Sequence, residues 1–415
     1  MKLSKLYTKT SKSIPSDESA NNARLLIQAG FIHKEMAGVY SYLPLGKIVL
    51  DKISEIVRQE MNKIGALEVQ MSTLQPRDIW EKTDRWDDKK VDNWFKTKLN
   101  NGQDLGIGLT HEEPIVDSLI GFVNSYKDLP VYVYQIQNKF RNELRAKSGL
   151  LRGREFLMKD LYSFSLNEED HQRYYNEVLL AYFKIYEKLG IGNDTYRTYA
   201  DGGIFSSSFS DEFQTLSEVG EDLIYLDEKN KIAINKEIYN PNNLKKLGIK
   251  ESDLKPYKAI EVGNTFSLGS KYTDSLGLYY TDSNGQKRSI IMGCYGIGIS
   301  RLMGVIAEKF SDDLGLVWPI NIAPAKVYLI SVGQDQKTQA KTQNLYDLLT
   351  QKCIDVIYDD RDIRIGEKFA DADLLGIPIR AVISSKHGEQ EVAVKQRTEK
   401  NEKIIKYVDL INLAK

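Results

Sequence analysis

The 415-residue sequence predicts an α+β protein, in which an antiparallel sheet flanked by helices precedes a small α/β domain. Two observations predict this fold. Residues 134–164 have the spacing of a β-hairpin, with charged side chains at every second position. Beyond residue 325, strand-like runs alternate with helical patterns. A chain of this length can bury more than one core, so we expect at least two domains.

The hairpin pattern surrounds a break at residues 146–149. Side chains of one parity on each side of the break are mostly polar or aromatic: Gln135, Gln137, Lys139, Arg141 and Glu143 before it, and Arg152, Arg154, Phe156, Met158, Asp160, Tyr162 and Phe164 after it. Successive strand residues point to opposite faces, so a hairpin would gather these side chains on one face. An ordinary surface hairpin is also polar on one face. Arginines interleaved with Phe, Met and Tyr favour a binding face over that simpler alternative.

Helical patterns occur on both sides of the hairpin. Residues 17–30 and 167–190 have helical spacing, the first with acidic residues at its start. Another helix follows Pro44 and Gly46, and its apolar stripe suits either the core or the interface with a second subunit. The stripe consists of Val49, Ile53, Ile56, Val57, Met61 and Ile64.

A short polar tetrad, residues 110–113, lies between a small-residue strand and an amphipathic helix. It reads Thr110-His111-Glu112-Glu113. Thr110 and Glu113 match a capping box, which is the simplest structural explanation. That explanation leaves Glu112 without a role.

Composition narrows the classes of function. Lys and Arg total 57 against 58 Asp and Glu, so any RNA partner must be held by local basic patches. No apolar run approaches the length of a membrane span, and we expect no signal peptide. Cys294 and Cys353 are too few for a disulfide framework, which favours a reducing cytoplasm. The four histidines lack ligand spacing, so we expect no structural metal site.

The second half of the chain suggests the domain boundaries. Residues 228–257 have the composition of a short connector, and an apolar strand, a glycine-rich turn and a helix are expected in residues 288–310. We place one domain at 1–320 and a C-terminal domain at 325–415, with residues 317–324 as the linker. Glycines 293, 296 and 298 do not match the dinucleotide fingerprint, and no phosphate-binding P-loop is present. An ATP site here must therefore use side chains on the antiparallel sheet.

The candidate residues suit a reaction at phosphorus. Arg141, Arg152 and Arg301 could bind carboxylate and phosphate oxygens and stabilise the negative charge that develops during phosphorus transfer. Phe156 offers a flat surface for a heteroaromatic ring. Glu112 and Asp160 could hold a substrate ammonium. Together these requirements describe adenylation of an amino acid, with a bound cation neutralising pyrophosphate.

At this point the sequence resembles the class II aminoacyl-tRNA synthetases, and specifically the bacterial-type prolyl-tRNA synthetases. The first class II motif is similar to LPLG and its helix, the second to KFRNELR with GLLRGREFLMKDLYSF, and the third to GCYGIGISRL. The THEE tetrad, YDDR, EKFADADLLGIP and VWP also match. The resemblance covers nearly the whole chain, and it implies a homodimeric proline–tRNA ligase that uses ATP and Mg2+ and has a C-terminal anticodon-binding domain.

The resemblance also implies residue roles. Arg141 and Arg301 would be the catalytic residues. The ATP site would comprise Arg141, Glu143, Arg152, Phe156, Glu212, Gln214 and Arg301, with magnesium near Glu212 and Gln214. The proline site would comprise Thr110, Glu112, Arg141, Met158, Asp160, Tyr162 and Cys294. The anticodon of tRNA(Pro) would be contacted by Arg361, Arg364 and Lys368.

Two departures from the family pattern bear on specificity. The connector at 228–257 replaces the large editing domain of many bacterial relatives, so we expect no cis-editing of mischarged alanyl-tRNA. In residues 201–213, Asp211 replaces a histidine, while Phe205, Ser207 and Phe209 crowd a loop that is usually rich in glycine. Asn264 also stands where a histidine is common. These differences concern the wall of the proline pocket.

Two other functions stay open from sequence alone. One is a synthetase-like paralogue that binds tRNA or amino acid without charging. The retained phosphate-binding arginines argue against it. The other is a class II synthetase for a different small amino acid, which only the loop at 201–213 favours.

Overall fold

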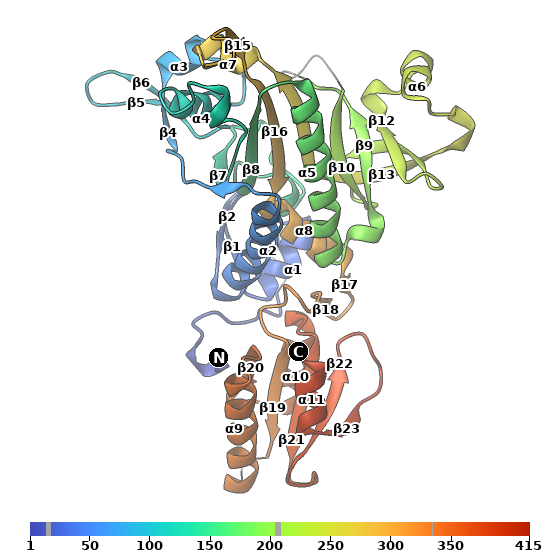
Figure 1. Ribbon diagram of the computed structural model, residues 1–415. Helices are drawn as coiled ribbons and strands as arrows, with labels where there is room; N and C mark the ends of the chain where they lie inside the picture. The colour runs from blue at the N-terminus through green and yellow to red at the C-terminus, as the bar shows by residue number, and fades with distance from the viewer. Residues whose placement is uncertain (14–17, 204–208, 334) are drawn as a thin grey trace. The chain divides into compact units, whose positions relative to one another are not determined.

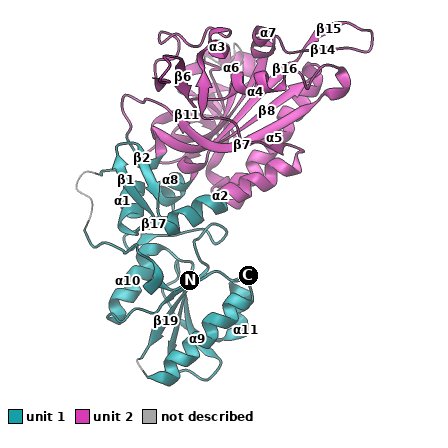
Figure 2. Cartoon of the chain, turned by 90° about the vertical axis from the view of Figure 1, so that its left-hand side faces the viewer, with its two compact units in different colours: residues 1–53, 147–150, 303–415 teal, residues 54–146, 151–302 magenta. Residues whose placement is uncertain are grey.

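The computed structural model describes residues 1–13, 18–203, 209–333 and 335–415. Two compact units divide the chain (Figure 2): residues 54–146 with 151–302 form the larger, and residues 1–53, 147–150 and 303–415 form the other. Among the described helices, none has the length and apolar character needed to cross a membrane.

The larger unit is organised around a sheet of nine described strands (Figure 1). In spatial order these are β10 (Ser210–Leu216), β9 (Thr195–Ala200), β12 (Ile232–Asn235), β11 (Asp222–Asp227), β13 (Leu254–Gly269), β16 (Ile291–Gly298), β8 (Glu155–Ser165), β7 (Val131–Phe140) and β3 (Leu67–Glu68). Most neighbours pair antiparallel, and β12–β9 and β3–β7 pair parallel. The predicted antiparallel sheet is confirmed.

Helices and short strands complete the larger unit. They are α3 (Arg77–Glu81), α4 (Glu112–Leu119), α5 (Glu168–Lys188), α6 (Pro241–Leu247) and α7 (Lys271–Leu276), with β4 (Leu74–Pro76), β5 (Lys96–Lys98), β6 (Asp104–Ile107), β14 (Tyr279–Thr281) and β15 (Lys287–Ser289). Helix α5, predicted from its helical spacing, contacts β8 and β16 and buries a face of Tyr, Leu and Ile side chains. Asn167 caps this helix by accepting the Asp170 N–H.

The predicted hairpin is the pair β7–β8, and its register confirms the shared face. Lys139 lies opposite Phe156, Gln137 opposite Met158, and Gln135 opposite Asp160. This polar face is buried, with Gln135 only 1% exposed. The simpler alternative of a solvated surface hairpin is therefore wrong.

Two local predictions about the hairpin and the third motif are also wrong. Arg141, Glu143 and Arg152 lie in the connection between β7 and β8, because the connection spans residues 141–154 and is longer than the expected break. The expected glycine-rich turn at residues 293–298 is strand β16. A Cβ at Gly296 would lie 2.4 Å from Met158 Cε, so glycine allows the β8 side chain to cross this strand.

The connector at 228–257 is folded as part of the larger unit. It contributes β12 and α6, and Ile234, Ile238 and Leu244 form a small buried cluster there. Asn240 caps α6, Pro241 occupies its first turn, and Gly248 ends it in the left-handed conformation. The segment is therefore an ordered edge of this unit.

The other unit contains the N-terminal elements α1 (Asn21–Gln28), β1 (Ile32–Met36) and β2 (Val39–Tyr42), the hairpin β17 (Ser311–Asp312) and β18 (Gly315–Leu316), and a C-terminal α/β module. Along the chain, α2 (Pro44–Lys63) and α8 (Ile299–Lys309) pass from one unit into the other. Helix α1 is shorter than predicted and begins at Asn21, with no acidic residue in its first turn. In α2, Val49, Ile53, Val57 and Met61 are fully buried within the single chain, so this part of the predicted stripe is core.

The C-terminal module has a sheet of five described strands in the order β20 (Val356–Asp359), β19 (Val327–Val332), β21 (Ile379–Ser384), β22 (Glu391–Gln396) and β23 (Lys403–Lys406). Its helices are α9 (Gln336–Gln351), α10 (Ile365–Leu375) and α11 (Tyr407–Leu413). The predicted alternation of strands and helices is confirmed, with β19 parallel to β20 and β21. Strand β23 and helix α11 were not predicted.

Candidate active site

A charged network is buried on the polar face of the β7–β8 hairpin. Lys139 Nζ lies 2.8 Å from Asp160 Oδ1 and donates to His111 Nδ1 at 2.7 Å. Gln135 and the Tyr162 hydroxyl both donate to Asp160 Oδ2, at 2.9 and 2.8 Å. Burial raises the pKa of Asp160, but the Lys139 ammonium and the Gln135 amide outweigh that effect and lower it below its ordinary value. Asp160 is therefore held as a carboxylate.

His111 takes part in this network as a neutral ring. Burial and the neighbouring Lys139 lower the pKa of His111 to about 4. Because Lys139 donates to Nδ1, the proton lies on Nε2, which donates to the Ser72 carbonyl at 3.0 Å. The His111 backbone N–H donates to the Tyr162 hydroxyl at 3.2 Å. The tetrad is thus fixed to the hairpin at His111.

Glu112 of the same tetrad begins α4 and is 1% exposed. Thr110 Oγ1 donates to its two carboxylate oxygens at 2.8 and 2.7 Å, and Cys294 Sγ of β16 donates at 3.3 Å. The predicted capping box is wrong, because His111 is the N-cap residue and makes no side-chain cap. Instead, Thr110 orients Glu112. Burial and Glu112 raise the pKa of Cys294, so its sulfur is a neutral thiol.

Glu113 shares a cation with Glu112. Arg85 Nη1 donates to Glu112 Oε2 at 3.2 Å and to Glu113 Oε1 at 3.0 Å. Thr83 Oγ1 also donates to Glu113, at 2.7 Å. Thr110, Glu112 and Cys294 therefore form one group, and Asp160 with Tyr162 forms a second that His111 connects to the first.

Arg141 closes the end of the hairpin beside Phe156. Its backbone N–H donates to the Arg154 carbonyl at 2.8 Å, and its guanidinium carbon lies 5.2 Å from the Phe156 ring centroid. Its Nε is buried and has no hydrogen-bond partner within the described residues. Burial and Arg301 lower the pKa of Arg141, while Glu261 raises it. A bound oxyanion would satisfy such a donor.

Arg301 is anchored by backbone carbonyls. Its Nε donates to the Leu151 carbonyl at 2.8 Å, and its Nη1 donates to the Glu261 carbonyl at 2.8 Å and to Glu261 Oε2 at 3.1 Å. These contacts fix the guanidinium while leaving it 28% exposed. Arg301 is thus a cation held rigidly beside Arg141.

Arg152 is the most exposed of the three predicted arginines. It forms an ion pair with Glu143 at 2.9 Å and lies 3.5 Å from Glu221 Oε2. Its side chain is 48% exposed. The Glu143 carbonyl also accepts from Arg154 Nε at 3.0 Å, which orders the connection between the two strands.

Acidic side chains gather on β10, β11 and β13. Gln214 Nε2 donates to Glu212 Oε2 at 2.8 Å and to Asp222 Oδ2 at 2.9 Å, while Asn264 Nδ2 donates to Glu261 Oε1 at 2.8 Å. Burial and Glu261 raise the pKa of Glu212 to about 8. Such like-charge carboxylates would be stabilised by a cation.

These carboxylates fit magnesium when a substrate supplies further oxygens. Among the described residues, no group of three or more His, Cys, Asp or Glu side chains is arranged to hold a metal ion. Magnesium usually takes one or two carboxylates together with substrate phosphates and waters. Glu212 and Glu261 provide that minimal set.

Comparison with known proteins identifies the family. Residues 95–310 match the tRNA synthetase class II core domain (G, H, P, S and T), and residues 326–415 match an anticodon binding domain. A proline–tRNA ligase of Rickettsia rickettsii (strain Sheila Smith) is 39% identical over 409 residues, which cover 94% of this chain and 95% of the relative. The chain belongs to the class II prolyl-tRNA synthetases. A proline–tRNA ligase of Wolbachia sp. subsp. Drosophila simulans (strain wRi) is 37% identical, and the alignment covers 99% of this chain and 99% of the relative.

Solved structures of prolyl-tRNA synthetases share the fold. The Giardia lamblia enzyme in complex with prolyl-adenylate aligns with a TM-score of 0.78 at 17% identity, over 93% of this chain and 74% of that chain. The Cryptosporidium parvum enzyme complexed with L-proline and AMP aligns with a TM-score of 0.77 at 16% identity, over 97% of this chain and 76% of that chain. At these identities the likeness supports the class II architecture of this prolyl-tRNA synthetase.

The departure at 201–213 is only partly described. Phe205 and Ser207 lie outside the described residues. Asp211, at the position where the family pattern predicts a histidine, is 4% exposed and accepts from Arg197 at 2.7 Å and from Tyr175 at 2.8 Å. Asp211 is therefore an internal ion-pair partner.

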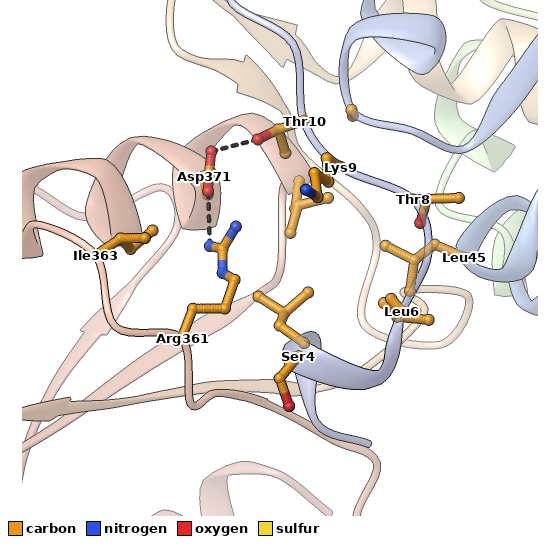
Figure 3. Close-up of a pocket in the computed structure, with 12 residues that line it drawn as sticks. Ser4, Leu6, Thr8, Lys9, Thr10, Leu45, Arg361, Ile363 and Asp371 are labelled. Carbon is orange, nitrogen blue, oxygen red and sulfur yellow. Dashed lines mark hydrogen bonds and ion pairs between the residues drawn. The ribbon is translucent and has the colours of Figure 1, made fainter.

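The three predicted anticodon residues differ in their contacts. Arg361 donates to Asp359 at 2.8 and 2.7 Å and to Asp371 at 2.7 Å, beside a cavity of about 280 Å³ under the N-terminal segment (Figure 3). Lys368 is 6% exposed and donates to the Asp359 carbonyl at 3.0 Å. These contacts favour structural roles for both. Arg364, at the N-cap of α10, is exposed, and its role in binding the anticodon stays a prediction.

Several participants were absent from the site predicted for this prolyl-tRNA synthetase. Arg85, His111, Lys139 and Glu261 all contact predicted site residues. Lys139 could have been found, since it shares the polar parity of the hairpin. Arg85 and Glu261 carry no comparable signal, because the predicted site residues that they contact, Glu112 and Arg301, are 27 and 40 positions away in the sequence.

Proposed function

We propose that this prolyl-tRNA synthetase activates L-proline with ATP and transfers the prolyl group to tRNA(Pro). The observation that carries the proposal is a buried pair of carboxylates, Glu112 at the start of α4 and Asp160 in β8, together with the neighbouring cations Arg141 and Arg301. Such a site takes an ammonium at one end and negatively charged oxygens at the other.

In the first step, a carboxylate oxygen of proline attacks the α-phosphorus of ATP, and pyrophosphate leaves. Arg141 holds the attacking carboxylate and the α-phosphate together, while Thr110 and Glu112 hold the ammonium. Asp160, Met158, Tyr162 and Cys294 form the wall around the ring. Catalysis in this scheme is positioning and electrostatic stabilisation by fixed charges.

The nucleotide would lie along the connection between β7 and β8. Phe156 stacks on adenine, Glu143 lies near its amino group, and Arg152 and Arg301 hold the outer phosphates. Glu212, Gln214 and Glu261 would hold magnesium, which when bound neutralises the charge of the phosphates.

In the second step, the 3′-terminal ribose hydroxyl of tRNA(Pro) attacks the prolyl carbonyl, and AMP leaves. The domain at 325–415 binds the anticodon, with Arg364 as its exposed cationic contact. Arg364→Ala should raise the KM for tRNA and leave proline-dependent ATP–pyrophosphate exchange unchanged. A loss of exchange in this variant would contradict the assignment.

The test of the activity is ATP–pyrophosphate exchange with proline, using threonine, alanine and cysteine as competing substrates. Exchange that depends on proline supports the proposal. Exchange with another amino acid alone would favour a synthetase of different specificity. No exchange with any of them would favour a non-charging paralogue.

We also propose that the enzyme lacks cis-editing, because the ordered segment 228–257 has no room for a second catalytic domain. A missing methylene provides only about 1–3 kcal/mol of discrimination, so alanine should be activated measurably. Pre-charged Ala-tRNA(Pro) should survive incubation with the enzyme. Rapid enzyme-dependent deacylation would overturn this part of the proposal.

We also propose that the enzyme is a cytoplasmic homodimer, as the resemblance to the family implies. Analytical ultracentrifugation should give twice the chain mass of 47.4 kDa. A species at the single-chain mass under assay conditions would contradict the dimer.

A further inference from the structure

Arg85 is a buried cation placed between two buried carboxylates. The residue is 5% exposed, and its Nη1 reaches both Glu112 at 3.2 Å and Glu113 at 3.0 and 3.1 Å. Both glutamates are at most 1% exposed and begin the same helix, α4. A buried charge is stable only when it is paired, so this trio acts as one electrostatic unit.

The surroundings hold Arg85 in place. Its backbone N–H donates to the Trp80 carbonyl at 3.0 Å, directly after α3. Its guanidinium carbon lies 5.0 Å from the Trp80 ring and 5.4 Å from the Tyr272 ring. Aromatic faces attract a desolvated cation, so both rings help to hold the guanidinium in place.

The trio has one positive charge for two carboxylates. Burial lowers the pKa of Arg85, but Glu113 and Glu112 raise it above its ordinary value, so Arg85 stays charged. Burial raises the pKa of Glu113, with Glu112 adding to the effect and Arg85 opposing it. Of the two carboxylates, Glu112 contacts Thr110 and Cys294 in the proposed proline pocket, whereas Glu113 contacts Thr83 outside it.

We propose that Arg85 is a positioning residue that aims the Glu112 carboxylate at the substrate ammonium, and that Glu113, by sharing the same Arg85 Nη1, leaves Glu112 only partly neutralised. This inference rests on the proposed activation of proline. Arg85 itself touches no substrate. Its single Nη1 is divided between two acceptors, so Glu112 keeps enough negative charge to attract the ammonium.

The test is the Michaelis constant for proline in ATP–pyrophosphate exchange. Arg85→Met should raise that KM by roughly tenfold or more, since 1.4 kcal/mol of lost interaction is a factor of ten. The KM for ATP should change by less than about twofold. Arg77→Met is the matched control: Arg77 is an arginine of the same segment, paired with Glu81 and Asp104 but 47% exposed, and its loss should leave both constants unchanged.

A second substitution separates electrostatics from packing. Arg85→Met leaves two adjacent buried carboxylates that must share a proton, so adding Glu113→Gln should free Glu112 and recover at least half of the lost proline affinity on a logarithmic scale. Glu113→Gln alone should raise the KM for proline by a smaller factor, because Arg85 then pairs with Glu112 exclusively. A merely structural arginine would show no such rescue.

The outcomes are distinguishable. A wild-type enzyme inactive with proline would overturn the proposed function. An active wild type with an unchanged proline KM in Arg85→Met, or equal increases in the KM for proline and ATP without rescue, would overturn the role of Arg85 alone. If Arg85→Met does not fold, Glu113→Gln decides: a raised proline KM with an unchanged ATP KM supports the role, and an unchanged proline KM rejects it.

Discussion

The amino-acid side and the nucleotide side of the site handle charge in opposite ways. On the amino-acid side, Lys139 pairs with Asp160 and Arg85 with Glu112, and all four side chains are nearly inaccessible. On the nucleotide side, Arg152 and Arg301 stay partly exposed, and the buried Nε of Arg141 has no partner among the described residues.

This difference matches what each side is proposed to bind. A zwitterion of small volume needs a rigid cavity whose charges are fixed before binding. A polyphosphate with a metal ion brings its own charges. The arginines and carboxylates on the nucleotide side can therefore stay partly exposed to solvent before the nucleotide binds. Removing a charge should therefore mainly lower the stability of the protein on the amino-acid side and mainly lower its activity on the nucleotide side.

The largest effect is expected at the buried pair. Lys139→Met leaves Asp160 uncompensated and should lower the free energy of unfolding by about 3–5 kcal/mol, measured by urea denaturation. Adding Asp160→Asn removes both charges and should restore part of that loss. Lys188→Met, which breaks a partly exposed pair with Glu60, is the control and should cost less than about 1 kcal/mol. A similar loss of unfolding free energy in Lys139→Met and Lys188→Met would contradict the special role of the buried pair on the amino-acid side.

Arg141 should show the reverse pattern. Arg141→Ala should reduce the exchange rate by roughly 100- to 1,000-fold, because it removes a donor at the developing negative charge. Its unfolding free energy should change little. Arg145→Ala, an exposed arginine of the same connection, should keep full exchange activity. Near-normal exchange in Arg141→Ala would refute its role.

Glu212 should lower the stability of the protein as pH rises, although the proposed activity needs its carboxylate. Its pKa is raised from 4.5 to about 8, so the folded protein holds a proton that the unfolded chain releases, and wild-type stability falls as pH rises through that range. Without magnesium, Glu212→Gln should be more stable than wild type at pH 8 by about 1–2 kcal/mol and nearly equal at pH 5. Its exchange activity should be lower. A stability difference that is the same at both pH values would contradict the assignment.

The smallest effect is expected at Cys294. Its thiol makes one weak contact with Glu112, which keeps Thr110 and Arg85 as stronger donors. Cys294→Ala should raise the KM for proline by less than about threefold, since a weak thiol hydrogen bond contributes only about 0.5 kcal/mol. A tenfold rise would mean that the thiol itself sets the pocket.

Much of the architecture could be predicted because it depends on local periodicity. The two-residue period of residues 134–164 predicted the shared face of β7 and β8, and the alternation after residue 325 predicted the C-terminal sheet. Boundaries were less predictable. Arg141 lies beyond the end of its strand, and β16 continues as a strand where a turn was expected, with Gly296 leaving room for the crossing Met158 side chain.

By itself, the sequence determined the family and the paired strands of the hairpin, and it predicted a set of side chains for the site. Only the tertiary structure decided their charge states and partners. Cys294 meets Glu112 across 182 positions of sequence, Lys139 meets His111 across 28, and Arg85 meets both glutamates from a separate segment. Electrostatic pairing depends on distance in space and on exclusion of water, and neither is written in the local pattern of residues.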